Sequence, residues 1–156
     1  MALPTGSKAP DFNLKSKTPE GMVNVQLSDN FGKSKTVLLF VPAAFTGVCT
    51  KELCEISEGM NVYSDLGAKV YGISIDSPFA LAVWAERDGI TIPLLSDYQR
   101  EVINAYDVVL ADLAGLGPSG ARAAFVIDEQ GTIIYSEQVA TLELPNFDAI
   151  KAVLSA

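Results

Sequence analysis

The sequence predicts an α/β fold in a single domain that spans residues 1–156. Apolar runs of strand length alternate with segments in which apolar residues recur at helical spacing. No repeat, low-complexity tract or linker-like change in composition interrupts this alternation. Hydrophobic residues make up 49% and charged residues 19% of the 156 positions, which is enough to bury one core.

The first elements are an antiparallel hairpin and a buried strand. Residues 12–14 and 23–27 are alternating runs, and the turn-forming residues 18–21 (TPEG) separate them. Residues 36–41 (TVLLFV) form a continuous apolar run, as expected of a central strand that is covered on both faces. Pro42 ends this strand, because proline has no N–H to donate to a sheet.

A long helix is predicted next, over residues 47–66. Leu53, Ile56, Met60 and Tyr63 recur at helical spacing, and Gly67 is a plausible stop. The remaining elements continue the alternation: strands at 70–75 and 92–95, helices at 78–87 and 98–106, a hairpin of strands 123–127 and 132–136, and a closing helix at 146–154. This order is typical of a thioredoxin-like domain with an added N-terminal β-hairpin.

Charge and composition exclude several classes of function. Nineteen acidic against eleven basic residues give a net charge of -8, which disfavours binding to nucleic acid or to an anionic membrane surface. The N-terminus has no basic region followed by an apolar one, so we expect a cytoplasmic protein with no membrane association. The chain has no histidine, which excludes imidazole bases, imidazole metal ligands and Cys-His nucleophile pairs.

The only two cysteines, Cys49 and Cys54, lie five residues apart in the predicted helix. Two thiols are too few for a structural zinc site made of thiolates. The first turn of a helix favours an anion, so the position of Cys49 favours a nucleophilic thiolate. Helical positions five apart have Cα atoms roughly 8.7 Å apart, whereas a disulfide needs about 4.4 to 6.8 Å. The spacing therefore predicts a redox switch that needs the helix to unwind, and two inert core thiols remain an alternative.

The segment PAAFTGVC, residues 42–49, resembles the P-x-x-x-T-x-x-C active-site loop of peroxiredoxins, the thiol peroxidases of the AhpC/TSA superfamily. The segment GARAAFVID, residues 120–128, resembles their arginine motif, and the resemblance runs from APDF near the start to the VID-EQG turn. The C-x4-C spacing is similar to that of peroxiredoxin Q or bacterioferritin-comigratory-type members. Thr46-Gly47-Val48 replaces the more common Thr-Pro-Gly or Thr-Pro-Val, as in some single-domain subgroups.

The resemblance implies a role for six residues. They are Cys49 as peroxidatic cysteine, Cys54 as resolving cysteine, Thr46 as hydrogen-bonding partner of thiolate and peroxide, Pro42 as a shield of the pocket, Arg122 as the stabilising cation, and Glu52 as a brace of Arg122. It also implies reduction of hydrogen peroxide or organic hydroperoxides through a sulfenic acid, with no metal or organic cofactor. The expected partners are the peroxide and thioredoxin or a similar dithiol reductant, and the expected assembly is a monomer or a homodimer.

The residues themselves leave alternatives open. Thr46 could serve only as a helix N-cap, Pro42 only as a strand terminator, and Arg122 and Glu52 only as surface charges. For the whole chain, one alternative is a general thiol-disulfide oxidoreductase, although C-x-x-C is the spacing typical of that class. The other is a non-enzymatic thioredoxin-like module that senses oxidant or binds a partner.

Overall fold

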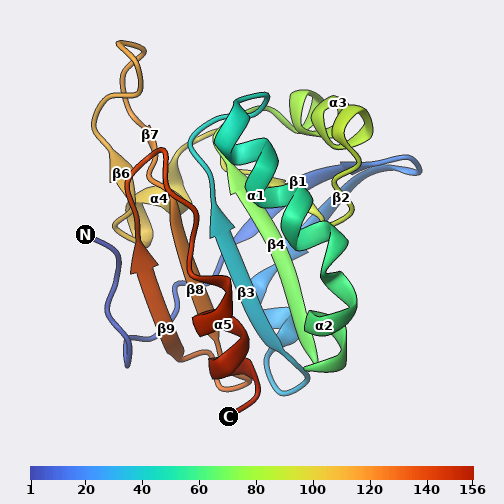
Figure 1. Ribbon diagram of the computed structural model, residues 1–156, viewed down its shortest axis with the longest axis vertical. Coiled ribbons are helices and arrows are strands. Elements are labelled where there is room, and N and C mark those ends of the chain that lie inside the picture. The colour runs from blue at the N-terminus through green and yellow to red at the C-terminus, as the bar shows by residue number, and fades with distance from the viewer.

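The computed structural model describes residues 1–156 as one α/β unit (Figure 1). Its strands are β1 Asn13–Thr18, β2 Gly21–Gln26, β3 Lys35–Phe40, β4 Ala68–Ser74, β5 Leu94–Ser96, β6 Val109–Leu110, β7 Ser119–Gly120, β8 Ala123–Ile127 and β9 Ile133–Gln138. Its helices are α1 Gly47–Glu58, α2 Met60–Asp65, α3 Pro78–Asp88, α4 Glu101–Ala105 and α5 Phe147–Leu154, with a 3-10 turn at Leu27–Asn30.

Seven strands form the main sheet, in the order β2-β1-β5-β4-β3-β8-β9. The neighbours β3, β4 and β5 are parallel, whereas β8 and β9 continue the sheet as antiparallel strands. The hairpin of β1 and β2 is antiparallel and joins the sheet through β5. The predicted thioredoxin-like α/β fold with an N-terminal hairpin is confirmed.

The sheet separates two hydrophobic clusters. Helices α1, α2 and α5 lie on one face with α3 at its margin, and α4 lies on the opposite face (Figure 1). Side chains of β3 alternate between the two faces: Val37 and Leu39 belong to the first cluster and Leu38 and Phe40 to the second. All four are fully buried, so β3 is the central strand that its continuous apolar run predicted.

The predicted helix over residues 47–66 is two helices, and this expectation was wrong in detail. Gly59 separates α1 from α2 with φ -91° and ψ 10°, outside the helical range. Glycine weakens a helix because it loses the most conformational freedom on folding. Tyr63 of α2 still packs in the same cluster as Leu53 of α1, which explains why the helical spacing of apolar residues continues across the break.

The segment between α4 and β8 was not predicted as regular structure. It forms a small separate sheet of β6 and β7, which pair antiparallel through Val109–Leu110 and Ser119–Gly120. Strands of two residues are too short for an alternating pattern to be recognised. No helix in the structure combines the length and the apolar character needed to cross a bilayer.

Candidate active site

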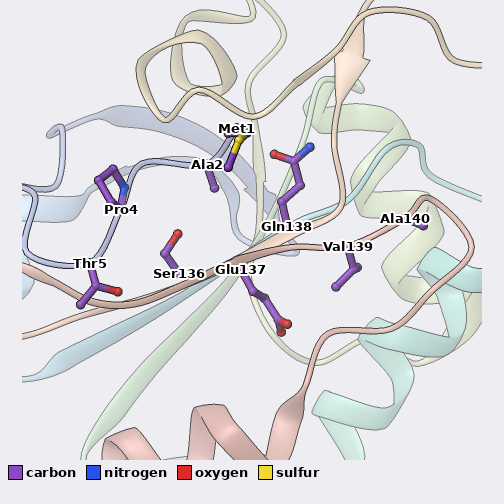
Figure 2. Close-up of a pocket in the computed structure, with 9 residues that line it drawn as sticks. All are labelled: Met1, Ala2, Pro4, Thr5, Ser136, Glu137, Gln138, Val139 and Ala140. Atoms are coloured by element: carbon purple, nitrogen blue, oxygen red, sulfur yellow. The ribbon is translucent and has the colours of Figure 1, made fainter.

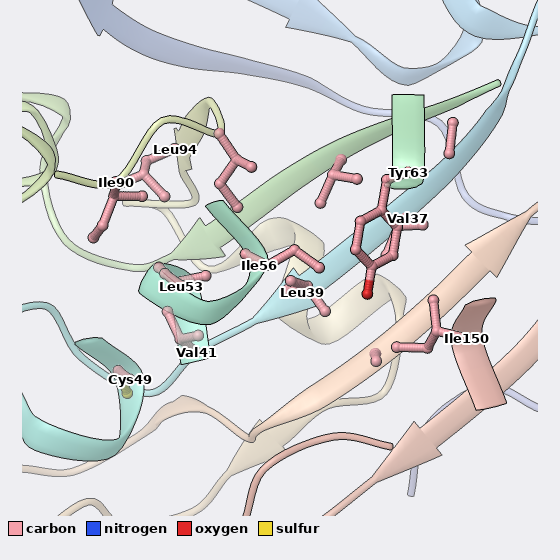
Figure 3. Close-up of a cluster of buried hydrophobic side chains, with 14 of the residues drawn as sticks. Val37, Leu39, Val41, Cys49, Leu53, Ile56, Tyr63, Ile90, Leu94 and Ile150 are labelled. Carbon is pink, nitrogen blue, oxygen red and sulfur yellow. The ribbon is translucent and has the colours of Figure 1, made fainter. Parts of the chain in front are cut away.

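Cys49 lies in the first turn of α1, directly after the loop that follows β3. It is the third residue of α1 and only 1% exposed. Figure 3 shows its side chain at the start of the helix, where the buried cluster of Leu53 and Val41 ends. Because the backbone N–H groups of a first helical turn have no intrahelical partner, their dipoles favour a negative charge on a side chain at this position.

The loop before α1 is held by polar contacts at both of its sides. The carbonyl oxygen of Pro42, a buried residue, accepts a hydrogen bond of 2.5 Å from the Ser119 hydroxyl of β7. The backbone N–H of Ala44 donates to the carboxylate of Asp76 at 2.8 Å. Phe45 adopts a positive φ of 64°, which is rare for a bulky residue and reverses the chain immediately before the helix.

Thr46 occupies the N-cap position of α1 but makes no capping bond with its side chain. Its hydroxyl instead donates to the carbonyl of Ala43 at 2.8 Å. The side chain is therefore fixed within the loop, and its oxygen keeps lone pairs that can accept a further hydrogen bond. The structure gives no direct bond between Thr46 and Cys49, although both line the same cavity.

Arg122, the residue before β8, reaches Cys49 because β8 pairs with β3. Because Phe40 of β3 pairs with Ala123 of β8, the residue before β8 lies beside the end of β3, where the loop to Cys49 begins. The guanidinium Nη2 donates to Cys49 Sγ at 3.1 Å. Nε and Nη2 both donate to the carbonyl oxygen of Thr141, at 2.9 Å and 2.8 Å.

This contact places a fixed positive charge beside the sulfur. Arg122 is 2% exposed, so water screens its charge only weakly. A guanidinium that donates to sulfur stabilises the thiolate more than the neutral thiol. Arg122 is thus a buried group in contact with the thiol, and a solvated surface charge is excluded.

Glu52, one turn after Cys49, forms a buried ion pair with Arg122. Arg122 Nη1 lies 2.5 Å from Glu52 Oε2, and the glutamate is 0% exposed. Its other oxygen, Oε1, is buried without any hydrogen-bond partner. Burial raises the pKa of Glu52 to about 7, against the lowering effect of Arg122 and with a further increase from Glu137 and Glu55. A carboxyl group with this pKa can exchange a proton near neutral pH.

A cavity of about 550 Å³ opens over Cys49. It is lined by residues from four separate segments: Pro42, Ala43, Thr46, Gly47, Val48, Cys49, Leu110, Asp112, Leu113, Ala114, Arg122, Thr141 and Leu142. The cavity brings Pro42, Thr46, Cys49 and Arg122 together, whereas Glu52 and Cys54 do not line it. Sequence reasoning missed the walls built by Leu110–Ala114 and Thr141–Leu142, for which the sequence carries no local signal.

A second hollow of about 590 Å³ lies between the N-terminal segment and β9 (Figure 2). Its lining consists of Met1, Ala2, Pro4, Thr5, Ser136, Glu137, Gln138, Val139 and Ala140. The side chain of Glu137 points away from the one of Gln138, to the opposite side of β9 (Figure 2). No thiol and no cation side chain faces this hollow, so the chemistry of the chain is concentrated at Cys49.

Cys54 lies on the same helix in different surroundings. It is partly buried, and its Sγ donates to the backbone carbonyl of Asp88, at the end of α3, over 3.3 Å. Burial raises the pKa of the Cys54 thiol, and the charges of Asp88 and Glu58 raise it further. Both cysteines are free thiols, and α1 is continuous between them.

Trp84 of α3 connects the two cysteine regions. Its Nε1 donates to the Thr50 hydroxyl at 3.0 Å, one residue after Cys49. Its ring centroid lies 6.2 Å from the ring of Phe45, and the Arg87 guanidinium lies over that ring at 4.8 Å. Trp84 is fully buried and contacts both the loop and the first turn of α1, so its fluorescence should change when either of them moves.

Residues 5–136 match the AhpC/TSA family. The chain belongs to this family. A chloroplastic 2-cysteine peroxiredoxin of Chattonella marina var. antiqua is 33% identical over 143 residues, which are 87% of this chain and 71% of the relative. Rv2521 of Mycobacterium tuberculosis, whose name also places it among the peroxiredoxins, is 36% identical over 137 residues, 86% of this chain and 85% of its own length.

The fold comparison agrees with the family. The solved structure of Mycobacterium tuberculosis AhpC superposes with a TM-score of 0.85 at 27% identity, covering 99% of this chain and 92% of that one. Membership in the AhpC/TSA family makes the chain a thiol-dependent peroxidase, which is an oxidoreductase.

Proposed function

We propose that the chain reduces hydrogen peroxide and small organic hydroperoxides with Cys49 as the attacking thiolate. The observation that carries this assignment is the 3.1 Å contact between Arg122 Nη2 and Cys49 Sγ at the base of the cavity. Cys54 has no cation beside it and does not line the cavity. Only one of the two thiols therefore has both a charge partner and room for a substrate.

In the proposed oxidation step, the thiolate of Cys49 attacks one oxygen of the peroxide. The S–O bond forms, the O–O bond breaks, the sulfur becomes a sulfenic acid, and the leaving oxygen takes a proton to give water or an alcohol. Negative charge moves from sulfur to the leaving oxygen. Arg122, which contacts the sulfur, is positioned to stabilise this charge as it moves. Because the Thr46 hydroxyl already donates to Ala43, its oxygen is left to accept the O–H of the peroxide.

In the proposed resolving step, Cys54 attacks the sulfenic sulfur, the S–S bond forms and water leaves. The two thiols share one intact helix, so the first turns of α1 must unwind and the contact of Cys54 with Asp88 must break. A dithiol protein of the thioredoxin type would then reduce the disulfide.

Two free cysteines in a chain of this size suit a reducing cytoplasm, which we propose as the location.

Peroxide consumption by Cys49→Ser tests the assignment. We expect the variant to lose activity to the level of the uncatalysed reaction, because serine is not a thiolate nucleophile. The matched control is Cys54→Ser, which keeps Cys49 and should consume one peroxide per chain before it stops. Undiminished turnover in Cys49→Ser would rule the mechanism out. Reduction of insulin disulfides without peroxidase activity would instead favour a general disulfide oxidoreductase.

A further inference from the structure

Three ionisable groups share one buried position. Arg122 donates to Cys49 Sγ at 3.1 Å through Nη2 and lies 2.5 Å from Glu52 Oε2 through Nη1. The exposed fractions are 2% for Arg122, 1% for Cys49 and 0% for Glu52. One cation therefore serves two groups that are both able to carry a negative charge.

Charge balance limits how many of these groups ionise together. With Cys49 as thiolate and Glu52 as carboxylate, two negative charges would face one positive charge among side chains that are almost fully buried. An unbalanced buried charge is strongly unfavourable. Other charges facing Glu52 make the deficit worse: Glu55 of the same helix and Glu137 of β9 are both acidic. The site is neutral only when one of the pair Cys49 and Glu52 is protonated.

The hydrogen bonds of Glu52 show which oxygen is available to hold the proton. Oε2 accepts from Arg122, but Oε1 is buried with no partner at all. A charged carboxylate with an unsatisfied buried oxygen is costly, and a neutral carboxyl group in the same position is less so. The surroundings of Glu52 thus disfavour its ionised form. The helix start and Arg122, in contrast, stabilise the thiolate form of Cys49.

We propose that Glu52 and Cys49 share one proton across Arg122, so that the reduced site is a Cys49 thiolate beside a neutral Glu52 carboxyl group. The S–H proton leaves sulfur, the Glu52 carboxylate gains one proton, and the net charge of the three groups stays at zero. Glu52 acts through Arg122 and does not line the substrate cavity, so it is a positioning residue that sets the charge on the sulfur.

The consequence for the reaction rests on the proposed function. Once the thiolate becomes a neutral sulfenic acid, Arg122 loses one anionic partner, and ionisation of Glu52 becomes favourable. Glu52 then releases a proton in the step in which the leaving oxygen takes one. The oxidation step would in this way proceed without a change in the net charge of the buried site.

The proton can be counted in the reduced protein without any peroxide. We use the Cys54→Ser background, near neutral pH and with weak buffering, and alkylate Cys49 with iodoacetamide. Ultraviolet absorbance measures the thiolate lost, and a pH indicator measures the protons released. We expect thiolate absorbance together with release of about half a proton per chain, since alkylation removes the sulfur anion and Glu52, with a pKa of about 7, then ionises to about half near neutral pH. Glu52→Gln should show the thiolate but release almost no proton.

Glu58→Gln is the matched control, because it removes an exposed charge from the same helix that is not among those acting on Glu52, and it should behave like the parent. Infrared difference spectra of the parent, which need no variant at Glu52, should show loss of a protonated-carboxyl band on alkylation. A thiolate signal without proton release, no thiolate signal, or equal release from Glu52→Gln would overturn the proposal. Failure of the peroxidase assignment is seen separately, as undiminished peroxide consumption by Cys49→Ser.

Discussion

The two thiols of α1 lie on one helix but in opposite electrostatic surroundings. Cys49 is in the first turn, is buried, and receives a hydrogen bond from the Arg122 guanidinium. Cys54 lies about 1.4 turns later, donates to the carbonyl of Asp88, and faces the acidic groups Asp88 and Glu58. The same functional group is therefore favoured as an anion at the first position and as a neutral thiol at the second.

This difference separates the two chemical steps. In the proposed mechanism, a thiolate is needed at Cys49 before the peroxide arrives, whereas Cys54 has no task until the sulfenic acid exists. The intact helix keeps Cys54 protonated and bonded to α3, which prevents it from competing for oxidant. Unwinding of α1 would move Cys54 away from Asp88 and into water, where the thiolate forms more readily. The helix thus controls both the distance between the sulfurs and the reactivity of the second one.

Removal of Cys54 is expected to have the largest effect on sustained turnover. In Cys54→Ser the oxidation of Cys49 should proceed at the parental rate, but recycling by a dithiol protein should stop after one turnover. Cys49 should then overoxidise to sulfinic acid at high peroxide. Stopped-flow fluorescence of Trp84, which is bonded to Thr50, should keep the fast oxidation phase and lose the slower resolving phase. Full multiple turnover would show that another thiol resolves Cys49.

Replacement of Arg122 by lysine is expected to affect the oxidation step itself. The guanidinium donates to Cys49, Glu52 and Thr141 at the same time. The ammonium group of lysine lacks this planar set of donors and cannot reproduce the three bonds. We expect the second-order rate constant with peroxide to fall by about 10²-fold to 10³-fold, as for loss of a donor that stabilises transition-state charge. The control is Arg100→Lys, which is exposed and does not line the cavity over Cys49. A rate within a factor of about two of the parent would contradict the role.

The ionisation of Glu52 predicts a pH-dependent stability. In the Cys49→Ser background no thiolate shares the proton, and burial raises the pKa of Glu52 from 4.5 to about 7, so the folded chain binds more protons than the unfolded chain between these values. Stability should therefore fall as pH rises through this window, by on the order of 3 kcal/mol, and level off above it. Glu52→Gln should remove this part of the slope in urea unfolding, whereas Glu58→Gln should retain it. Parallel slopes in Cys49→Ser with and without Glu52→Gln would show that Glu52 titrates normally.

The smallest expected effect concerns the acidic surroundings of Cys54. In the Cys49→Ser background, Asp88→Asn removes one of the charges that raise the pKa of Cys54, while its backbone carbonyl still accepts the Sγ–H bond. We expect alkylation of Cys54 to accelerate about twofold to threefold, because burial, the larger cause, is unchanged. Asp65→Asn, at the exposed end of α2, provides the charge-matched control. Equal rates in the two variants would mean that burial alone sets the reactivity.

The sequence by itself determined the local features of this protein. Alternating and continuous apolar runs located the hairpin, the central strand β3 and most helices, because burial periodicity follows from backbone geometry. The segment PAAFTGVC placed Cys49 at a helix start, and the five-residue spacing to Cys54 already required unwinding for a disulfide. The break at Gly59 was missed because apolar spacing persists across it.

Only the tertiary structure decided the environment of the sulfur. Arg122 is 73 positions from Cys49 and reaches it because β8 pairs with β3 in a register that sets Ala123 opposite Phe40. The full burial of Glu52, its unpartnered oxygen and the cavity walls from Leu110–Ala114 and Thr141–Leu142 depend on the same packing. Contacts between distant segments leave no periodic trace in a sequence, since they arise from strand order and not from local backbone preference.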